Sequence, residues 1–135
     1  MNRRQFLGRS ALLAAGALTG WAESPTERIV AALASARRFL AERQSPDGAW
    51  RSKKYGAFRG GDALTPLVLW ALRGEAVTTG LRWLEALTAT QATRAEPWAD
   101  LRYPLFTASY AAQVFAVAGD ARRAGFWVEL VERLR

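Results

Sequence analysis

The chain has 135 residues, a length suited to one domain, and half of them are apolar, so a substantial core is expected. Its formal net charge of +7 comes from basic residues spread along the sequence rather than gathered in one tract, which argues against nucleic-acid binding. The sequence contains no cysteine and no histidine, and this excludes disulfide bonds, thiolate or imidazole catalysis, and the usual zinc sites.

Residues 1–22 have the build of an export signal. They begin with basic residues, continue through a weakly apolar stretch, and end in the small-x-small sequence "GWA", which is typical of a cleavage site. The alternative is an uncleaved membrane anchor, but the apolar stretch at residues 10–22 is short for a span that needs roughly 20 residues. We expect cleavage near Ala22, a mature domain over residues 23–135, and no stable membrane span afterwards.

This signal carries a pair of arginines. Arg3 and Arg4 are followed by Phe6 and Leu7, which resembles the twin-arginine (Tat) export signal of two arginines, any residue, then Phe-Leu. Such signals are addresses read by a receptor and are not anchors. The resemblance implies export through the Tat route to the periplasm or cell envelope.

The first helix of the mature part is predicted to run to about Arg43. Its start "SPTE" is a capping box, with Ser24 as the N-cap, Pro25 as the first helical residue and Glu27 at the third position. Apolar residues then recur at helical spacing. Residues 45–61 hold one proline and four glycines, so they are predicted to form a loop.

The rest of the chain also indicates helices. A second helix follows Asp62, and its apolar run "LVLWAL" predicts burial on all sides, with Gly74 ending it in a left-handed conformation. A third starts near residue 78, a second loop covers residues 91–104, and a fourth helix stops at Gly119. A fifth helix starts at Asp120. Since no segment alternates like a strand, the predicted class is all-α, with five mature helices.

The helices repeat. Phe39, Trp83 and Trp127 lie 44 residues apart, and the segment "WALRG" of the second helix aligns with "FAVAG" of the fourth at an offset of 45. Repetition at a fixed period is the signature of a repeat architecture. The repeating unit is therefore a helix, a loop and a helix, in about two and a half copies.

The segment "FLAERQSPDGAW" resembles the QW motif of the prenyltransferase and squalene-oxidocyclase repeats, in which a glutamine precedes Gly-x-Trp. That family folds as an α–α toroid, with inner helices ringed by outer ones, and the resemblance implies a partial toroid here. It implies that Gln44, Gly48 and Trp50 tie one repeat to the next, the glutamine bonding the terminus of the next outer helix and the tryptophan stacking on it. Gln91 and Trp98 form a second copy, which has a longer spacing and lacks the glycine.

The family's catalytic motifs are absent from this sequence. Cyclases of the family use Asp-x-Asp-Asp and protein prenyltransferases use a zinc site of Asp, Cys and His, and neither occurs here. Asp62 and Asp100 precede the two inner helices, but we expect an N-cap and a solvated loop acid rather than an acid pair. The glycine-rich "YGAFRGGD" lacks the Gly-Lys-Ser/Thr of a phosphate-binding loop and is predicted to be a linker. No catalytic residue, metal or cofactor is therefore expected.

The favoured interpretation is an exported repeat protein that serves in interaction or scaffolding, as a fragment of a longer array. The fifth helix presents apolar residues that predict a protein partner or self-association: Trp127, Val128, Leu130, Val131 and Leu134. One alternative is a terpenoid-cyclase-like enzyme whose catalytic half lies on another chain. Another is an envelope module for a polyprenyl or triterpene lipid, in which Trp70, Tyr110 and Phe115 line an apolar cavity, although such a stripe is also typical of plain core.

Overall fold

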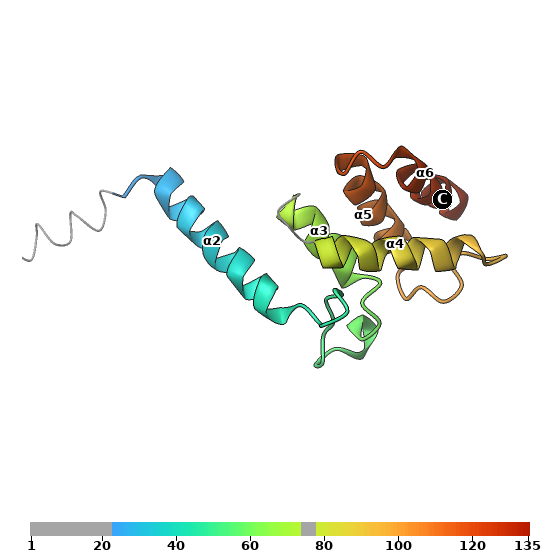
Figure 1. Cartoon of the computed structure of the whole chain (residues 1–135), viewed down its shortest axis with the longest axis horizontal. Helices are drawn as coiled ribbons and strands as arrows, with labels where there is room; N and C mark the ends of the chain where they lie inside the picture. The colour runs from blue at the N-terminus through green and yellow to red at the C-terminus, as the bar shows by residue number, and fades with distance from the viewer. Residues whose placement is uncertain (1–22, 74–77) are drawn as a thin grey trace, which may run out of the picture. The chain divides into compact units, whose positions relative to one another are not determined.

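The computed structural model describes residues 23–73 and 78–135 (Figure 1). The residues of the predicted export signal, Arg3, Arg4, Phe6 and Leu7, lie outside the described residues, as does Gly74. The chain divides after Phe39 into two compact units, which are considered separately below. Five α-helices and no strand occur within the described ranges, so the predicted all-α class is confirmed.

The first unit holds most of helix α2 (Pro25–Arg43), which has the predicted capping box. The amide of Glu27 donates to the Ser24 hydroxyl at 3.1 Å, and the amide of Ser24 donates to the Glu27 carboxylate at 3.2 Å. Each side chain thus satisfies an amide that has no partner within the helix. None of the residues of α2 is buried.

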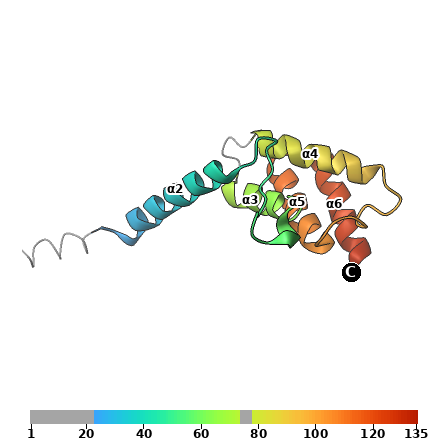
Figure 2. The same cartoon turned by 90° about the horizontal axis from the view of Figure 1, so that it is seen from below.

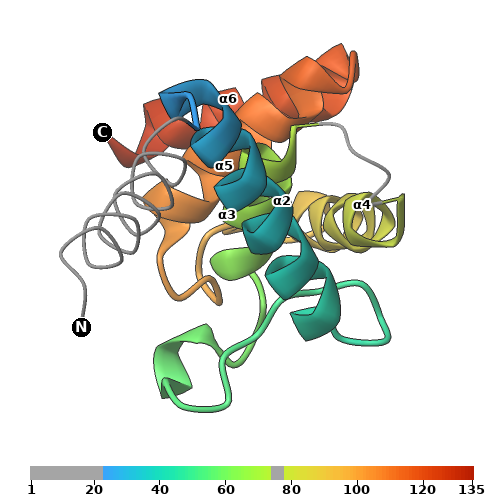
Figure 3. The same cartoon turned by 90° about the vertical axis from the view of Figure 1, so that its left-hand side faces the viewer.

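Among its described residues, the second unit contains four complete α-helices. A short 3-10 helix, η1, interrupts the loop after α2, where no regular element was predicted. This loop extends to one side of helices α3 to α6 (Figure 3). Gly119 turns the chain with φ +76°, and the Asp120 side chain caps the last helix by accepting from the Arg123 amide at 3.1 Å. The elements are η1 (Gly56–Phe58), α3 (Leu64–Leu72), α4 (Thr78–Ala92), α5 (Pro104–Val117) and α6 (Ala121–Leu134).

Helices α3 and α5 pack side by side and run in the same direction (Figure 2). Near their starts, the Thr107 hydroxyl donates to the backbone carbonyl of Asp62 at 3.1 Å. Further along, the rings of Trp70 and Tyr110 meet edge to face with centroids 5.3 Å apart. The start of α3 lies beside the start of α5, and the contact between the rings comes later in both helices. The two helices are therefore parallel.

Helices α4 and α6 form a second parallel pair. Arg123 near the start of α6 lies 3.7 Å from the Glu85 carboxylate, and the Trp127 indole donates to the Thr88 hydroxyl at 3.0 Å. Helix α5 also packs on α6, and α3 on α4. The four helices therefore make two layers, with α3 and α5 in one and α4 and α6 in the other.

The core lies between these two layers. Small residues on α5 let its neighbours approach closely, since Ala108 and Ala111 are completely buried. The largest completely buried hydrophobic side chains are Trp127, Phe115 and Leu84, which come from α6, α5 and α4. One apolar cluster thus joins all the helices of the second unit.

The prediction that α3 is buried on all sides is wrong. The helix is apolar throughout, but burial follows one face, and Ala71 is exposed while Trp70 is only half-buried. At the end of the helix Arg73 is left-handed, with φ 40°, and its amide donates to the Leu69 carbonyl at 3.1 Å. Gly74, the predicted C′ residue, lies outside the described residues.

The apolar face predicted to be unpartnered on α6 is mostly covered within the chain. Trp127 is completely buried and Leu130 is 2% exposed, because α4 and α5 pack on that face. Val131 and Leu134 are half-buried against the same core. Val128, 46% exposed, remains uncovered within the described residues.

Candidate functional site

Gln44 and Gly48 attach the loop after α2 to the start of α4. The Gln44 side-chain amide donates to the Gly48 carbonyl at 2.9 Å and to the Thr79 hydroxyl at 3.2 Å. Gly48 has φ +99°, and a β-carbon there would lie 2.3 Å from the Thr79 carbonyl oxygen. Both the backbone angle and the close approach to α4 therefore require glycine.

Trp50 completes this attachment and is 3% exposed. Its indole N–H donates to the Leu40 carbonyl at 2.7 Å, and its backbone amide donates to the Thr65 hydroxyl at 3.0 Å. Its ring lies against Gly80, where a β-carbon would be 2.8 Å from the indole. Trp50 thus connects the last turn of α2, the start of α3 and the start of α4. We call Gln44, Gly48, Trp50, Thr79 and Gly80 the loop clamp.

The second motif is built differently. The Gln91 amide donates to the Pro97 carbonyl at 2.6 Å and to the Asp100 carboxylate at 2.8 Å, so it closes its own loop. Gln91 is completely buried, and its carbonyl oxygen has no hydrogen-bond partner within the described residues. The Trp98 ring lies 4.7 Å from the guanidinium of Arg133, which is in the last turn of α6. In the first motif, by contrast, the Trp50 ring lies against the start of α4.

The two aspartates that precede α3 and α5 have structural partners. Asp62 was predicted to be the N-cap of α3, and this is wrong because Ala63 holds that position. The Asp62 carboxylate instead accepts a hydrogen bond from the Arg102 amide at 3.1 Å. Asp100 accepts from Gln91 and forms an ion pair with Arg94 at 3.1 Å, so it is more than a solvated loop acid. The described residues contain no group of three acidic, histidine or cysteine residues that could hold a metal ion.

The three aromatic residues predicted to line an apolar cavity are Trp70, Tyr110 and Phe115. Trp70 and Tyr110 contact each other, and Tyr110 also meets Phe106 with centroids 4.9 Å apart. Phe115 is 1% exposed within the core. Sequence reasoning missed Phe106 and also Arg73, whose guanidinium lies 5.3 Å from the Trp70 ring.

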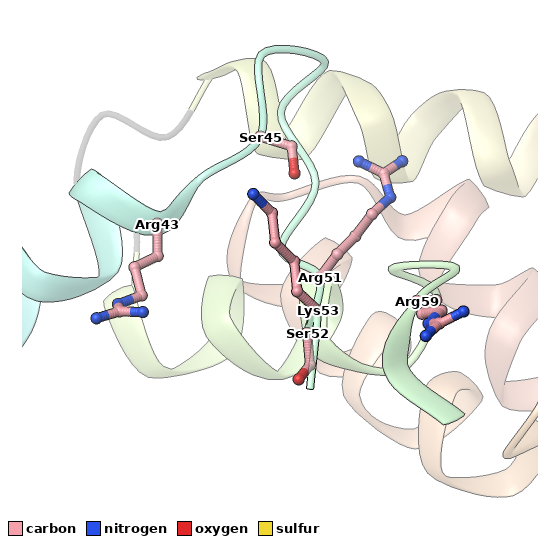
Figure 4. Close-up of a pocket in the computed structure, with 6 residues that line it drawn as sticks. All are labelled: Arg43, Ser45, Arg51, Ser52, Lys53 and Arg59. Carbon is pink, nitrogen blue, oxygen red and sulfur yellow. The ribbon is translucent and has the colours of Figure 1, made fainter. Parts of the chain in front are cut away.

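A pocket of about 360 Å³ lies beside the loop clamp (Figure 4). Its lining is cationic and hydroxylic, from the last residue of α2 and the loop that follows. Sequence reasoning missed it, since these residues fall in a segment interpreted as a linker and have no regular spacing. The lining residues are Arg43, Ser45, Arg51, Ser52, Lys53 and Arg59, hereafter the basic pocket.

One cation of the basic pocket is held by an acid. The Asp47 carboxylate accepts two hydrogen bonds from the Arg51 guanidinium, at 2.8 and 2.6 Å. This pairing lowers the pKa of Asp47 to about 2 and raises the pKa of Arg51. The Arg51 guanidinium also lies 5.8 Å from the Trp83 ring of α4. Arg51 is therefore fixed between the pocket and the next helix.

The chain matches no protein-family model, no curated protein and no solved structure. Across the described ranges, none of the helices combines the length and apolarity that crossing a membrane requires.

Proposed function

We propose that this chain is a non-catalytic repeat module of the prenyltransferase and squalene-oxidocyclase type, with a role in interaction or scaffolding. The loop clamp is the observation that carries the proposal. Gln44 bonds the start of the next outer helix at Thr79, and the Trp50 ring lies against Gly80 of that helix. This is the arrangement that the resemblance to the QW motif implies for a tie between repeats.

The layered helices support a partial toroid of about two and a half hairpins. In this proposal α3 and α5 are inner helices, and α2, α4 and α6 are outer ones. Ala63 and Ala108 lie 45 positions apart, and both are completely buried. Asp62 and Thr107, also 45 apart, bond directly at the start of the inner layer. Equivalent positions in neighbouring repeats thus face the same surroundings.

The placement of the acids favours this module over a cyclase-like enzyme with its catalytic half on another chain. Asp62 and Asp100 are the two carboxylates at the starts of the inner helices, and both are engaged in structural hydrogen bonds. An envelope lipid-binding module is the weaker alternative, because Trp70 and Tyr110 pack on each other and Phe115 is buried.

The proposal includes export by the Tat route to the periplasm or cell envelope, and self-association through α6 by way of Val128. Replacing Arg3 and Arg4 by lysine in a fusion to a Tat-dependent reporter should abolish export. In light scattering, the full chain should form dimers that Val128→Glu weakens. A chain that stays monomeric at high concentration contradicts the self-association.

The enzyme alternative has a direct test. The full chain is incubated with squalene or with a prenyl diphosphate, and the products are analysed by mass spectrometry. We expect no product. Conversion of either substrate, or a downstream reading frame that continues the repeat and supplies Asp-x-Asp-Asp, would sink the non-catalytic proposal.

A further inference from the structure

We propose that the basic pocket binds a phosphate group, either of a soluble phosphorylated molecule or of a lipid headgroup. This inference does not depend on the repeat module being non-catalytic. It is based on the charge balance of the pocket, on the backbone that holds its side chains, and on the contact between Arg51 and the next helix.

Four cations line the pocket, and two of them, Lys53 and Arg59, carry the argument. Asp47 already neutralises Arg51 through two hydrogen bonds. Within the described part of the chain, the side chains of Lys53 and Arg59 have no acidic partner. A phosphate group carries a charge of about −1.5 to −2 at neutral pH, whereas a single carboxylate carries −1. Phosphate therefore matches the unpaired charge of Lys53 and Arg59 better than a carboxylate does.

A backbone hydrogen bond brings the chain segments that carry the two unpaired cations together. The Ser52 amide donates to the Phe58 carbonyl at 3.1 Å, and the neighbours of this bonded pair are Lys53 and Arg59. The Ser52 hydroxyl accepts from the Tyr55 amide at 3.1 Å, which steadies the turn between them. A pair of cations held by a closed loop loses less conformational freedom on binding than two cations on free segments.

Hydroxyl donors complete the pocket. In Figure 4 the Lys53 side chain points toward Ser45, with Arg43 and Arg51 on either side. Ser45 lies in a fixed turn, since its amide donates to the Ala49 carbonyl at 2.8 Å and its carbonyl accepts from the Gly48 amide at 2.9 Å. Phosphate offers three strong acceptor oxygens, and these suit guanidinium, ammonium and hydroxyl donors together.

The test titrates the full chain with inorganic phosphate at low salt and follows backbone amides by NMR, with sodium chloride at equal ionic strength as the reference. Lys53→Ala should weaken phosphate binding by about tenfold, the loss expected when one charge-assisted hydrogen bond is removed. The matched control is Lys54→Ala. Lys54 is the adjacent lysine, its ammonium lies 5.4 Å from the Tyr55 ring, and it does not line the pocket.

A second arm identifies the source of the phosphate. The chain is sedimented with phosphatidylcholine vesicles that contain or lack phosphatidic acid. Binding only to the phosphatidic-acid vesicles, lost in Lys53→Ala, assigns the pocket to a lipid headgroup. Binding of inorganic phosphate without binding to vesicles assigns it to a soluble ligand. A phosphate titration identical to the chloride titration, or equal weakening by Lys53→Ala and Lys54→Ala, overturns the proposal. Neither result would affect the repeat architecture.

Discussion

Replacement of Gly48 by alanine should destabilise the chain more than any other glycine-to-alanine change at a turn. Gly48 has φ +99°, a conformation that costs a residue with a β-carbon roughly 1–2 kcal/mol. The new β-carbon would also lie 2.3 Å from the Thr79 carbonyl oxygen. Relief of that overlap requires the loop to move off α4, at about 1–3 kcal/mol. The expected loss in the free energy of unfolding is therefore roughly 2–5 kcal/mol.

The matched control is Gly119→Ala. Gly119 also has a positive φ, +76°, but an added β-carbon there would meet no atom within 4 Å. It incurs the conformational cost alone, roughly 1–2 kcal/mol. Both changes reduce the entropy of the unfolded chain alike, so the difference between the two variants isolates the overlap with α4.

Urea unfolding, followed by tryptophan fluorescence and far-ultraviolet circular dichroism, measures both variants. The fluorescence of Trp50 is informative because this residue is 3% exposed in the folded chain. We expect Gly48→Ala to unfold at a clearly lower urea concentration than Gly119→Ala. If the two variants unfold together, the loop does not lie on the start of α4 and the reasoning for the loop clamp is wrong.

Two further predictions concern Asp47 and Trp127. The pKa of Asp47 is about 2 in the folded chain, below its ordinary value of 3.8, so its pairing with Arg51 stabilises the fold above about pH 4 and is lost as the pH falls toward 2. In Asp47→Asn, the melting temperature should depend less on pH in that acidic window. The variant should lose less than about 1 kcal/mol in the free energy of unfolding at neutral pH, since the pair is half-exposed. An unchanged dependence of the melting temperature on pH contradicts this prediction. Trp127→Phe should lower the free energy of unfolding in urea by about 1–2 kcal/mol, because the hydrogen bond to the Thr88 hydroxyl is lost. Trp83 is the half-buried residue 44 positions earlier, and Trp83→Phe should lower this free energy clearly less. Equal losses would mean that the bond does not contribute.

Local chemistry explains which parts of the fold could be predicted from the sequence. The start of α2 depends on residues three positions apart, Ser24 and Glu27, and this capping box is present as predicted. The last helix was predicted to start at Asp120, and the structure shows this residue as its N-cap. Such signals require only neighbours along the chain. The starts of α4 and α5 were likewise predicted within one residue.

Two of the failures have a common physical cause, since they depend on partners distant in sequence. Asp62 bonds Arg102, 40 residues away, so a local N-cap rule could not place it. The apolar face of α6 is covered by α4 and α5, which periodicity alone cannot reveal. The basic pocket is assembled by a bond between Ser52 and Phe58 across an irregular loop, and no periodic pattern marks it.

The glycine at position 80 limits how the helices of this chain can be rearranged. The start of α4 accepts the indole of Trp50 only because Gly80 has no side chain, and the counterpart in α6, 44 residues later, is Ala124. A permuted chain in which α6 directly followed the first loop would place a methyl group against the indole. Helices α4 and α6 are therefore not interchangeable. In a longer array assembled from this sequence, each helix that follows a copy of the loop with Trp50 should be a copy of α4, with its glycine.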